Sequence, residues 1–209
     1  MAGLLVVATS ACSAHRLSHP NLMPASPLAE KATAYRRVLV AGLSATAVAG
    51  VDPNEEASRL LRSELRNEAS VQVVDAEPLK VERRVLDDVP FWRRLGEEYR
   101  EPLIVTGVVD FQSIGPYYQE RQVGRRTLRL FLPQFRLSLR LLLIDGATGE
   151  RIGSAVCGPI VAHAASSGER ALILFYRLVE RTMPSVLAIF GRRTMVRSGF
   201  GPTCQVEAA

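Results

Sequence analysis

Residues 135–145 read FRLSLRLLLID, and this stretch decides the fold class. Phe135, Leu137 and Leu139 alternate with Arg136 and Ser138, and a period of two residues is typical of a strand with one buried face. The segment DGATG at 145–149 has the composition of a tight turn, so residues 150–161 are expected to return as the second strand of an antiparallel hairpin.

Upstream of this hairpin, apolar runs alternate with helical patterns. Asp52 and Pro53 provide an N-cap and a first-turn proline for a helix that continues to about residue 65. A second helix is expected at 91–99, with Phe91, Leu95 and Tyr99 on one face. Short strands are expected at 38–43, 71–74 and 103–111. Strands that alternate with helices predict a sheet with parallel pairs in it.

The whole pattern predicts an α/β domain over residues 36–191. Its expected order is β-α-β-α-β-β-β-α, a mixed sheet with helices packed on it, a terminal antiparallel hairpin and a long C-terminal helix at about 167–190. Pro184 is expected to kink or break that helix. Residues 192–209 are expected to form a loose tail.

Composition limits the broad class of protein. With 209 residues and 47% hydrophobic residues, the chain suits one domain with tails. The net charge is +5, and lysine occurs only at Lys31 and Lys80, so arginine carries nearly all the positive charge. The arginines are spread along the chain, which favours a compositional origin, with nucleic acid or anionic lipid as alternatives. No run is apolar enough for a membrane-spanning helix.

The N-terminus resembles a bacterial lipoprotein signal. Residues 1–12 read MAGLLVVATSAC, a short apolar run that leads through small residues to Cys12. The resemblance implies that Cys12 is the lipid-modified residue and that the protein is anchored in the outer membrane, facing the periplasm. The alternative is an ordinary N-terminus with an unmodified cysteine. Three prolines within 13–35 predict a flexible tether there, and Pro20 argues against a metal site at His15 and His19.

The most distinctive surface stretch lies between the strands, at 112–133. Tyrosines and arginines gather in and just after it, and we interpret them as an interaction surface: Tyr117, Tyr118, Arg121, Arg125, Arg126, Arg129 and Arg136. A solvated hairpin, a nucleic-acid site and a contact with lipid headgroups are the alternatives. Leu128, Leu130 and Leu132 alternate in the opposite parity to the leucines after Pro133, which predicts a β-bulge near Pro133.

No motif for catalysis, a cofactor or a metal is apparent. The sequence contains no GxSxG, P-loop or GxGxxG pattern. His163, Asp110 and Asp145 are interpreted as surface or turn residues rather than catalytic groups. Cys157 and Cys204 either form a disulfide in an oxidising compartment or stay apart, with Cys157 as a small buried residue. We therefore expect a protein that is not an enzyme and that holds no cofactor and no metal.

An ordered set of segments resembles the curli secretion channel family (CsgG-like) and related periplasmic lipoproteins. The segments are RVLVAG at 37–42, LLRSEL at 60–65, VQVVD at 71–75, LIVTG at 103–107, LSLRLLLID at 137–145 and ATGE at 147–150. The resemblance covers about residues 36–190. Relatives in this group form rings in polysaccharide export or activate peptidoglycan synthases.

The resemblance implies a non-enzymatic bacterial envelope domain that oligomerises or binds an envelope partner. Channel members span the membrane with long alternating hairpins, whereas residues 112–133 are too short and too rich in arginine for that role. The implied function is therefore that of a scaffold or accessory subunit in a secretion or envelope-assembly complex. A cytosolic, arginine-rich, nucleic-acid-binding α/β protein is the alternative.

Overall fold

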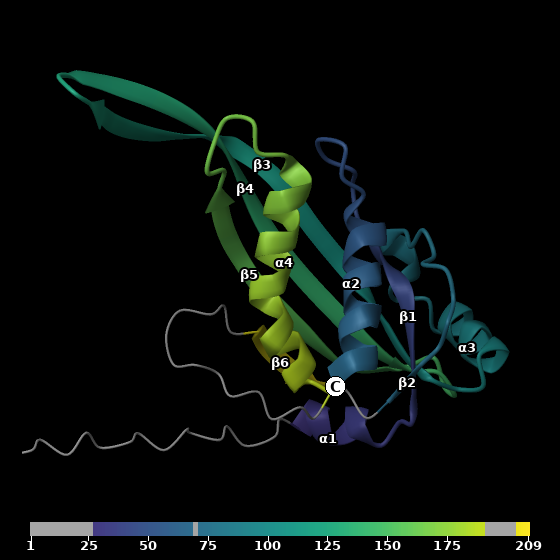
Figure 1. The fold of residues 1–209 in the computed structure, drawn as a ribbon. Coiled ribbons are helices and arrows are strands. Elements are labelled where there is room, and N and C mark those ends of the chain that lie inside the picture. Colours follow the sequence, from purple (N-terminus) through teal and green to yellow (C-terminus); the bar gives the residue numbers. More distant parts are fainter. Residues whose placement is uncertain (1–26, 69–70, 191–203) are drawn as a thin grey trace, which may run out of the picture.

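The computed structural model describes residues 27–68, 71–190 and 204–209. They form a six-stranded mixed sheet in the order β2-β1-β3-β4-β5-β6, with helices packed on it (Figure 1). The strands are β1 (Arg37–Ser44), β2 (Gln72–Val73), β3 (Leu103–Val123), β4 (Arg126–Asp145), β5 (Arg151–His163) and β6 (Cys204–Ala208). The α-helices are α1 (Pro27–Thr33), α2 (Pro53–Glu68), α3 (Val89–Glu98) and α4 (Ala171–Ala188), with a short 3₁₀ helix, η1 (Arg83–Val85). The predicted fold class is confirmed.

The sheet is parallel in its first half and antiparallel in its second. β1 pairs in parallel with both β2 and β3, through connections that contain α2 and α3. β3, β4, β5 and β6 pair in antiparallel fashion. The oxygens of Asp145 accept hydrogen bonds from Ala147 N at 3.1 Å and from Thr148 Oγ1 at 3.0 Å, and these bonds close the β4–β5 turn. The predicted hairpin is therefore present.

Two apolar clusters lie on opposite faces of the sheet, because neighbouring residues of a strand point to opposite sides. The larger cluster joins Val38 and Val40 of β1 to α2 and α4, and these two helices cover one face side by side (Figure 1). The smaller cluster joins Leu39 and Ala41 to Trp92 of α3 on the other face. The strongly apolar runs at 38–43 and 103–109 follow from this burial on both faces.

Several sequence predictions about the ends of the chain are wrong. Helix α1 occupies Pro27–Thr33 within the segment predicted as a tether, because Leu28 is fully buried and packs near Gly153 of β5. Strand β6 occupies Cys204–Ala208 within the predicted loose tail, because it pairs with β5 from Gly153 to Cys157. The β4–β5 hairpin is therefore not the end of the sheet.

Other elements differ from the prediction in length. β2 has only two residues, whereas β3 and β4 extend to 21 and 20 residues and run through most of 112–133. Helix α4 continues past Pro184, so the proline does not break the helix. The predicted β-bulge is confirmed: the β3–β4 register shifts between Ser113 and Pro116, opposite Pro133.

Candidate interaction surface

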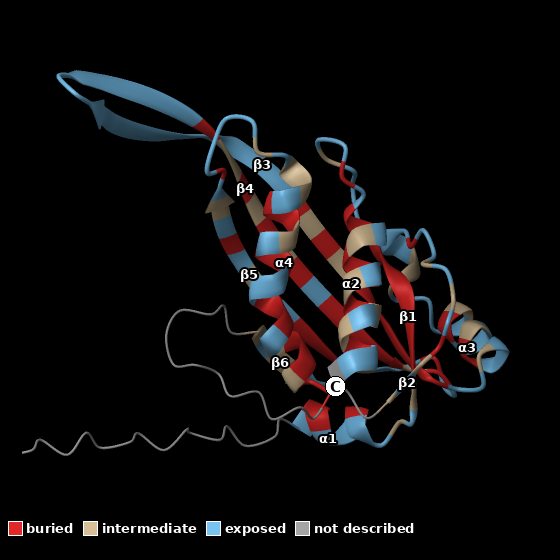
Figure 2. Ribbon diagram, viewed as in Figure 1, coloured by how far each residue is buried: buried red, intermediate tan, exposed pale blue. Residues whose placement is uncertain are grey.

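The outer halves of β3 and β4 project from the body of the domain as a two-stranded arm, residues 112–133 (Figure 1). β1 ends at Ser44, opposite Val108, and β5 ends at His163, opposite Gln134. In the part of the chain that the structure describes, residues 114–132 of the arm therefore pair only with each other, and Pro133 at the base also accepts a hydrogen bond from Ala164 N at 2.8 Å. Ten residues of a strand, 114–123, span about 30 Å. Figure 2 shows the arm as the most continuously exposed part of the sheet.

Local sequence explains the shape of the arm. Val123 pairs with Arg126, so Gly124 and Arg125 form a two-residue hairpin turn. Gly124 has a φ of +61°, and a positive φ at the first central residue alone is typical of a type II′ turn, where glycine is favoured. At the base, Pro116 lies opposite Pro133. Proline lacks an amide hydrogen and therefore ends regular pairing with any further strand.

The register assigns the arm side chains to two faces, since directly opposed residues share a face. One face carries Tyr117 opposite Leu132, Gln119 opposite Leu130, and Arg121 opposite Leu128. The other face carries Tyr118 opposite Phe131, and Glu120 opposite Arg129. The alternating leucines of the sequence thus form one apolar row, with polar residues across from two of them.

Apolar side chains are concentrated on the arm rather than spread over the surface. The described residues include twelve exposed large apolar side chains, of which seven belong to the arm: Ile114, Tyr117, Tyr118, Val123, Leu128, Leu130 and Phe131. Tyr118 and Phe131 are the most exposed, at 65% and 56%, and their rings form an edge-to-face pair 4.9 Å apart. A concentrated apolar surface of this kind is typical of a site that contacts another molecule.

The base of the arm is fixed to the body. The ring of Tyr117 lies edge-on against His163 of β5, with the ring centroids 4.2 Å apart. Leu132 is only 3% exposed and belongs to the larger apolar cluster. Arg136 Nη2 donates to Gln112 Oε1 at 2.8 Å, and Gln112 Nε2 donates to Asp110 Oδ1 at 2.6 Å. These contacts position the arm relative to the sheet.

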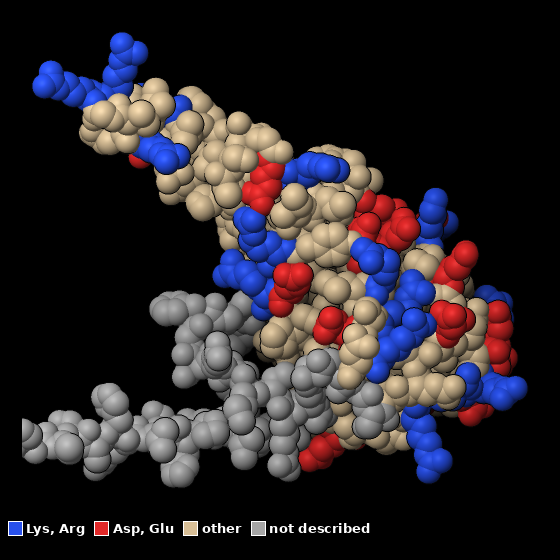
Figure 3. Space-filling view, viewed as in Figure 1, with Lys and Arg blue, Asp and Glu red and all other residues tan. Residues whose placement is uncertain are grey.

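The arginines of the arm differ in their partners. Arg129 forms an ion pair with Glu120 at 3.1 Å. Arg121, Arg125 and Arg126 form no ion pair with any described residue, and Figure 3 shows positive charge at the outer end of the arm. With four arginines against one glutamate, residues 112–133 have a net charge of +3.

Most of the predicted surface residues lie together. Tyr117, Tyr118, Arg121, Arg125, Arg126 and Arg129 all belong to the arm, while Arg136 lies half-buried just below it. The sequence interpretation missed Phe131, Val123 and the exposure of Leu128 and Leu130 as parts of this surface. The alternation of Leu128, Leu130 and Leu132 was the signal that a strand continues here. Cys12 lies outside the described residues.

The residues considered for catalysis do not form a site. Asp145 pairs with Leu103 and Asp110 pairs with Ser138, so the two carboxylates are about 20 Å apart along the sheet. His163 is exposed and contacts Tyr117. Among residues 27–68, 71–190 and 204–209, no group of three histidine, cysteine or acidic side chains is placed to hold a metal ion.

A second polar surface lies along α2. A hollow of about 530 Å³ is lined by Arg59, Arg62, Arg66, Asp75, Lys80 and neighbouring residues. Its three arginines have partners: Arg59 pairs with Glu56 and Arg66 with Asp75, at 2.8 and 2.9 Å, and Arg62 donates to the carbonyl of Ala76. Burial is the main cause that lowers the pKa of Arg62 below its usual value. The arginines of this hollow are therefore held by neighbouring groups of the chain itself.

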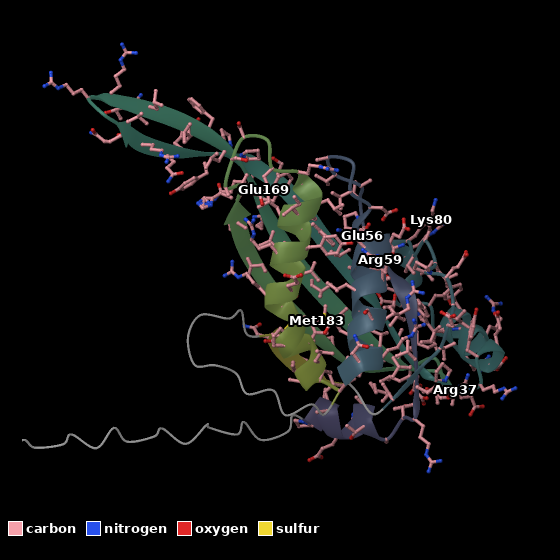
Figure 4. The ribbon with its side chains drawn as sticks, in the orientation of Figure 1. Arg37, Glu56, Arg59, Lys80, Glu169 and Met183 are labelled. Atoms are coloured by element: carbon pink, nitrogen blue, oxygen red, sulfur yellow. A yellow bond between two sulfur atoms is a disulfide. The ribbon has the colours of Figure 1, made fainter. Side chains whose placement is uncertain are left out.

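A polar cluster joins α2 to α4. Tyr176 donates its hydroxyl hydrogen to Glu56, and Arg59 contacts both residues. Figure 4 shows Glu56 and Arg59 next to each other on α2. Partial burial raises the pKa of Glu56, but the hydrogen bonds from Tyr176 and Arg59 outweigh it, so the net shift is downward. Burial, followed by the bond to Glu56, raises the pKa of Tyr176. The cluster fixes the spacing of the two helices that cover the sheet.

A disulfide bond joins Cys157 of β5 to Cys204 of β6. The two residues are opposed in the register, with a Cα–Cα distance of 4.2 Å, and Cys157 is fully buried. The sequence left open whether these cysteines pair, because the strand β6 that brings them together was not predicted.

Known proteins give no further indication of function. The chain matches no protein-family model and has no significant match among curated proteins. Within the described residues, no helix combines the length and the apolar character needed to cross a membrane. The functional interpretation therefore depends on the arm, the disulfide and the sequence of the N-terminus.

Proposed function

We propose that this chain is a non-enzymatic bacterial envelope lipoprotein that acts as a scaffold or accessory subunit of a secretion or envelope-assembly complex. In this proposal the arm is the contact element, and it binds a second copy of the chain or an envelope partner. The protein would be anchored in the outer membrane through Cys12 and would face the periplasm.

The exposed arm is the observation that carries the proposal. An isolated two-stranded hairpin is marginally stable in water, and this one exposes the edge-to-face pair of Tyr118 and Phe131. Aromatic residues and arginine are enriched in protein interfaces. A partner that covers Tyr118 and Phe131 would remove this apolar surface from water and order the arm.

The disulfide supports the proposed compartment. Disulfides persist in oxidising environments such as the periplasm and are rare in the bacterial cytosol. The bond between Cys157 and Cys204 therefore favours an exported protein over the cytosolic nucleic-acid-binding alternative. The lipoprotein-like sequence that ends at Cys12 points in the same direction.

Two experiments test the proposal. Light scattering on the purified chain should give a mass above the monomer value of 22.9 kDa, and Tyr118→Ser with Phe131→Ser should return it to the monomer. The matched control is Ile173→Ser on α4, which removes an exposed apolar side chain outside the arm. A monomeric wild-type chain that also binds no envelope protein would contradict the proposal.

Labelled palmitate tests the anchor separately. Cells that express the wild-type chain should incorporate the label, and Cys12→Ala should abolish incorporation. Recovery of the protein from the cytosol, with Cys12 unmodified, would overturn the proposed localisation.

A further inference from the structure

The tip of the arm combines exposed aliphatic side chains with exposed arginines, and we infer that it binds the surface of an anionic lipid bilayer. Val123 and Leu128 are 53% and 47% exposed. Arg125 lies in the turn between the two strands, and Arg126 follows it. This lipid contact goes beyond the proposed assembly role, which depends on the aromatic pair nearer the base.

The register places aliphatic and cationic groups next to each other. Val123 lies opposite Arg126, and Leu128 lies opposite Arg121. Because opposed residues share a face and alternate residues of one strand do so too, these four side chains form one surface beside the turn. A bilayer interface accepts such a combination, since apolar groups enter the acyl boundary while guanidinium groups stay at the phosphates.

The charge of the tip complements an anionic surface. Glu120 is the single acidic residue of the arm and pairs with Arg129 at 3.1 Å. Arg121, Arg125 and Arg126 have no ion pair with any residue that the structure describes, and the positive charge at the outer end of the arm is visible in Figure 3. Arginine binds phosphate oxygens in a bidentate manner, so phospholipid headgroups are suitable ligands.

A lipid surface fits this tip better than a nucleic acid does. Proteins that bind single strands combine a basic groove with aromatic rings that stack on the bases. Here Arg125 and Arg126 lie at the turn of a two-stranded arm (Figure 1), next to Val123 and Leu128, which have no ring. The aromatic pair Tyr118 and Phe131 lies five residues back along each strand, about 16 Å from the turn.

The test measures binding of the full chain carrying Cys12→Ala, so that no acyl group contributes. The protein is mixed at low salt with vesicles of phosphatidylglycerol and phosphatidylcholine, or of phosphatidylcholine alone, and bound protein is separated by flotation. Binding should require phosphatidylglycerol. Arg125→Gln with Arg126→Gln should weaken it about thirty-fold, because each basic residue near an anionic surface contributes about fivefold.

Matched variants separate the tip from the general charge of the protein. Arg83→Gln with Arg84→Gln removes the same charge from exposed positions in η1 and should have little effect. Val123→Ser with Leu128→Ser should also weaken binding, whereas Ile173→Ser on α4 should not.

Three results would overturn the inference: equal binding to phosphatidylcholine vesicles, equal losses in the tip and η1 variants, or binding of single-stranded RNA through the tip arginines without vesicle binding. Light scattering of the same samples without lipid reports assembly alone. A chain that is monomeric, binds no envelope protein and still binds vesicles through its tip would contradict the proposed function and leave the lipid contact in place. An oligomer that does not bind vesicles would support the proposed assembly and contradict the lipid contact.

Discussion

At the scale of the single residue, Asn54 connects three segments of the chain. Its Oδ1 accepts a hydrogen bond from Leu43 N at 2.6 Å, and its Nδ2 donates to Leu79 O at 3.0 Å. The side chain thereby ties the end of β1 and the loop after β2 to the first turn of α2. Because Asn54 is nearly buried, its loss leaves backbone groups without partners.

We therefore expect Asn54→Ala to lower the free energy of unfolding by about 1–3 kcal/mol. Urea denaturation followed by circular dichroism measures the change. Asn67→Ala is the matched control, since Asn67 is exposed on the same helix and alanine favours helix formation. Equal stability of Asn54→Ala and the wild type would show that these hydrogen bonds do not hold the segments together.

Glu56 predicts a specific dependence of stability on pH. Its pKa is lower in the folded protein than the ordinary value of 4.5, so the folded state binds its proton less readily than the unfolded chain does. The contribution of ionised Glu56 to the free energy of unfolding is complete above pH 4.5, and it is lost as the pH falls through the pKa of Glu56 in the folded protein. As the pH is lowered below 4.5, Glu56→Gln should therefore lose less stability than the wild type does. Urea denaturation at several pH values measures the difference. The same acid slope in both proteins would contradict this.

At the scale of the element, strand β6 and helix α1 depend on contacts that the local sequence does not display. β6 has only five residues, and its position is set by pairing with β5 and by the disulfide. Lys31 Nζ of α1 donates to Ala209 O at 2.7 Å, so the first and last described elements meet. Sequence periodicity predicts elements that bury a regularly repeating face, such as α2 and β4. It does not predict short elements whose position depends on contacts with residues far away in the sequence.

The same reasoning explains the arm. Alternation from Phe135 predicted a strand because only one face is buried over residues 135–140, whereas both faces are buried at 141–144. In the arm, before Pro133, the side chains are mostly exposed on both faces. No burial pattern therefore marks these strands, and only the alternation of Leu128, Leu130 and Leu132 indicated them. The arginines and tyrosines of the surface were identified by composition, whereas Phe131 and Val123 became visible only with the register.

Loss of the disulfide should destabilise the domain. The bond closes a sequence separation of 47 residues, for which about 2–4 kcal/mol of stabilisation is typical. Cys157→Ala with Cys204→Ala should lower the urea midpoint, and reducing agent should lower the midpoint of the wild type but not that of this variant. If reduction leaves the wild-type midpoint unchanged, the bond does not stabilise the folded chain.

At the scale of the whole molecule, the body and the arm have separate requirements for stability. The body buries both apolar clusters, and the arm contributes only Leu132 to them. Replacing residues 114–131 with a short Asn-Gly turn should therefore keep the melting temperature of the monomeric body within about 5 °C, whereas assembly should be lost. Thermal denaturation followed by circular dichroism checks this. Failure of the shortened chain to fold would show that the arm is part of the core.

The most direct test of the arm as a contact surface is crosslinking in living cells. A photoreactive phenylalanine analogue at Tyr118 should give a protein adduct of discrete higher mass after illumination, because this side chain is expected to lie in the interface. The same analogue at Ile173, an exposed site on α4, should give none. Adducts of equal yield at both positions, or at neither, would contradict the account.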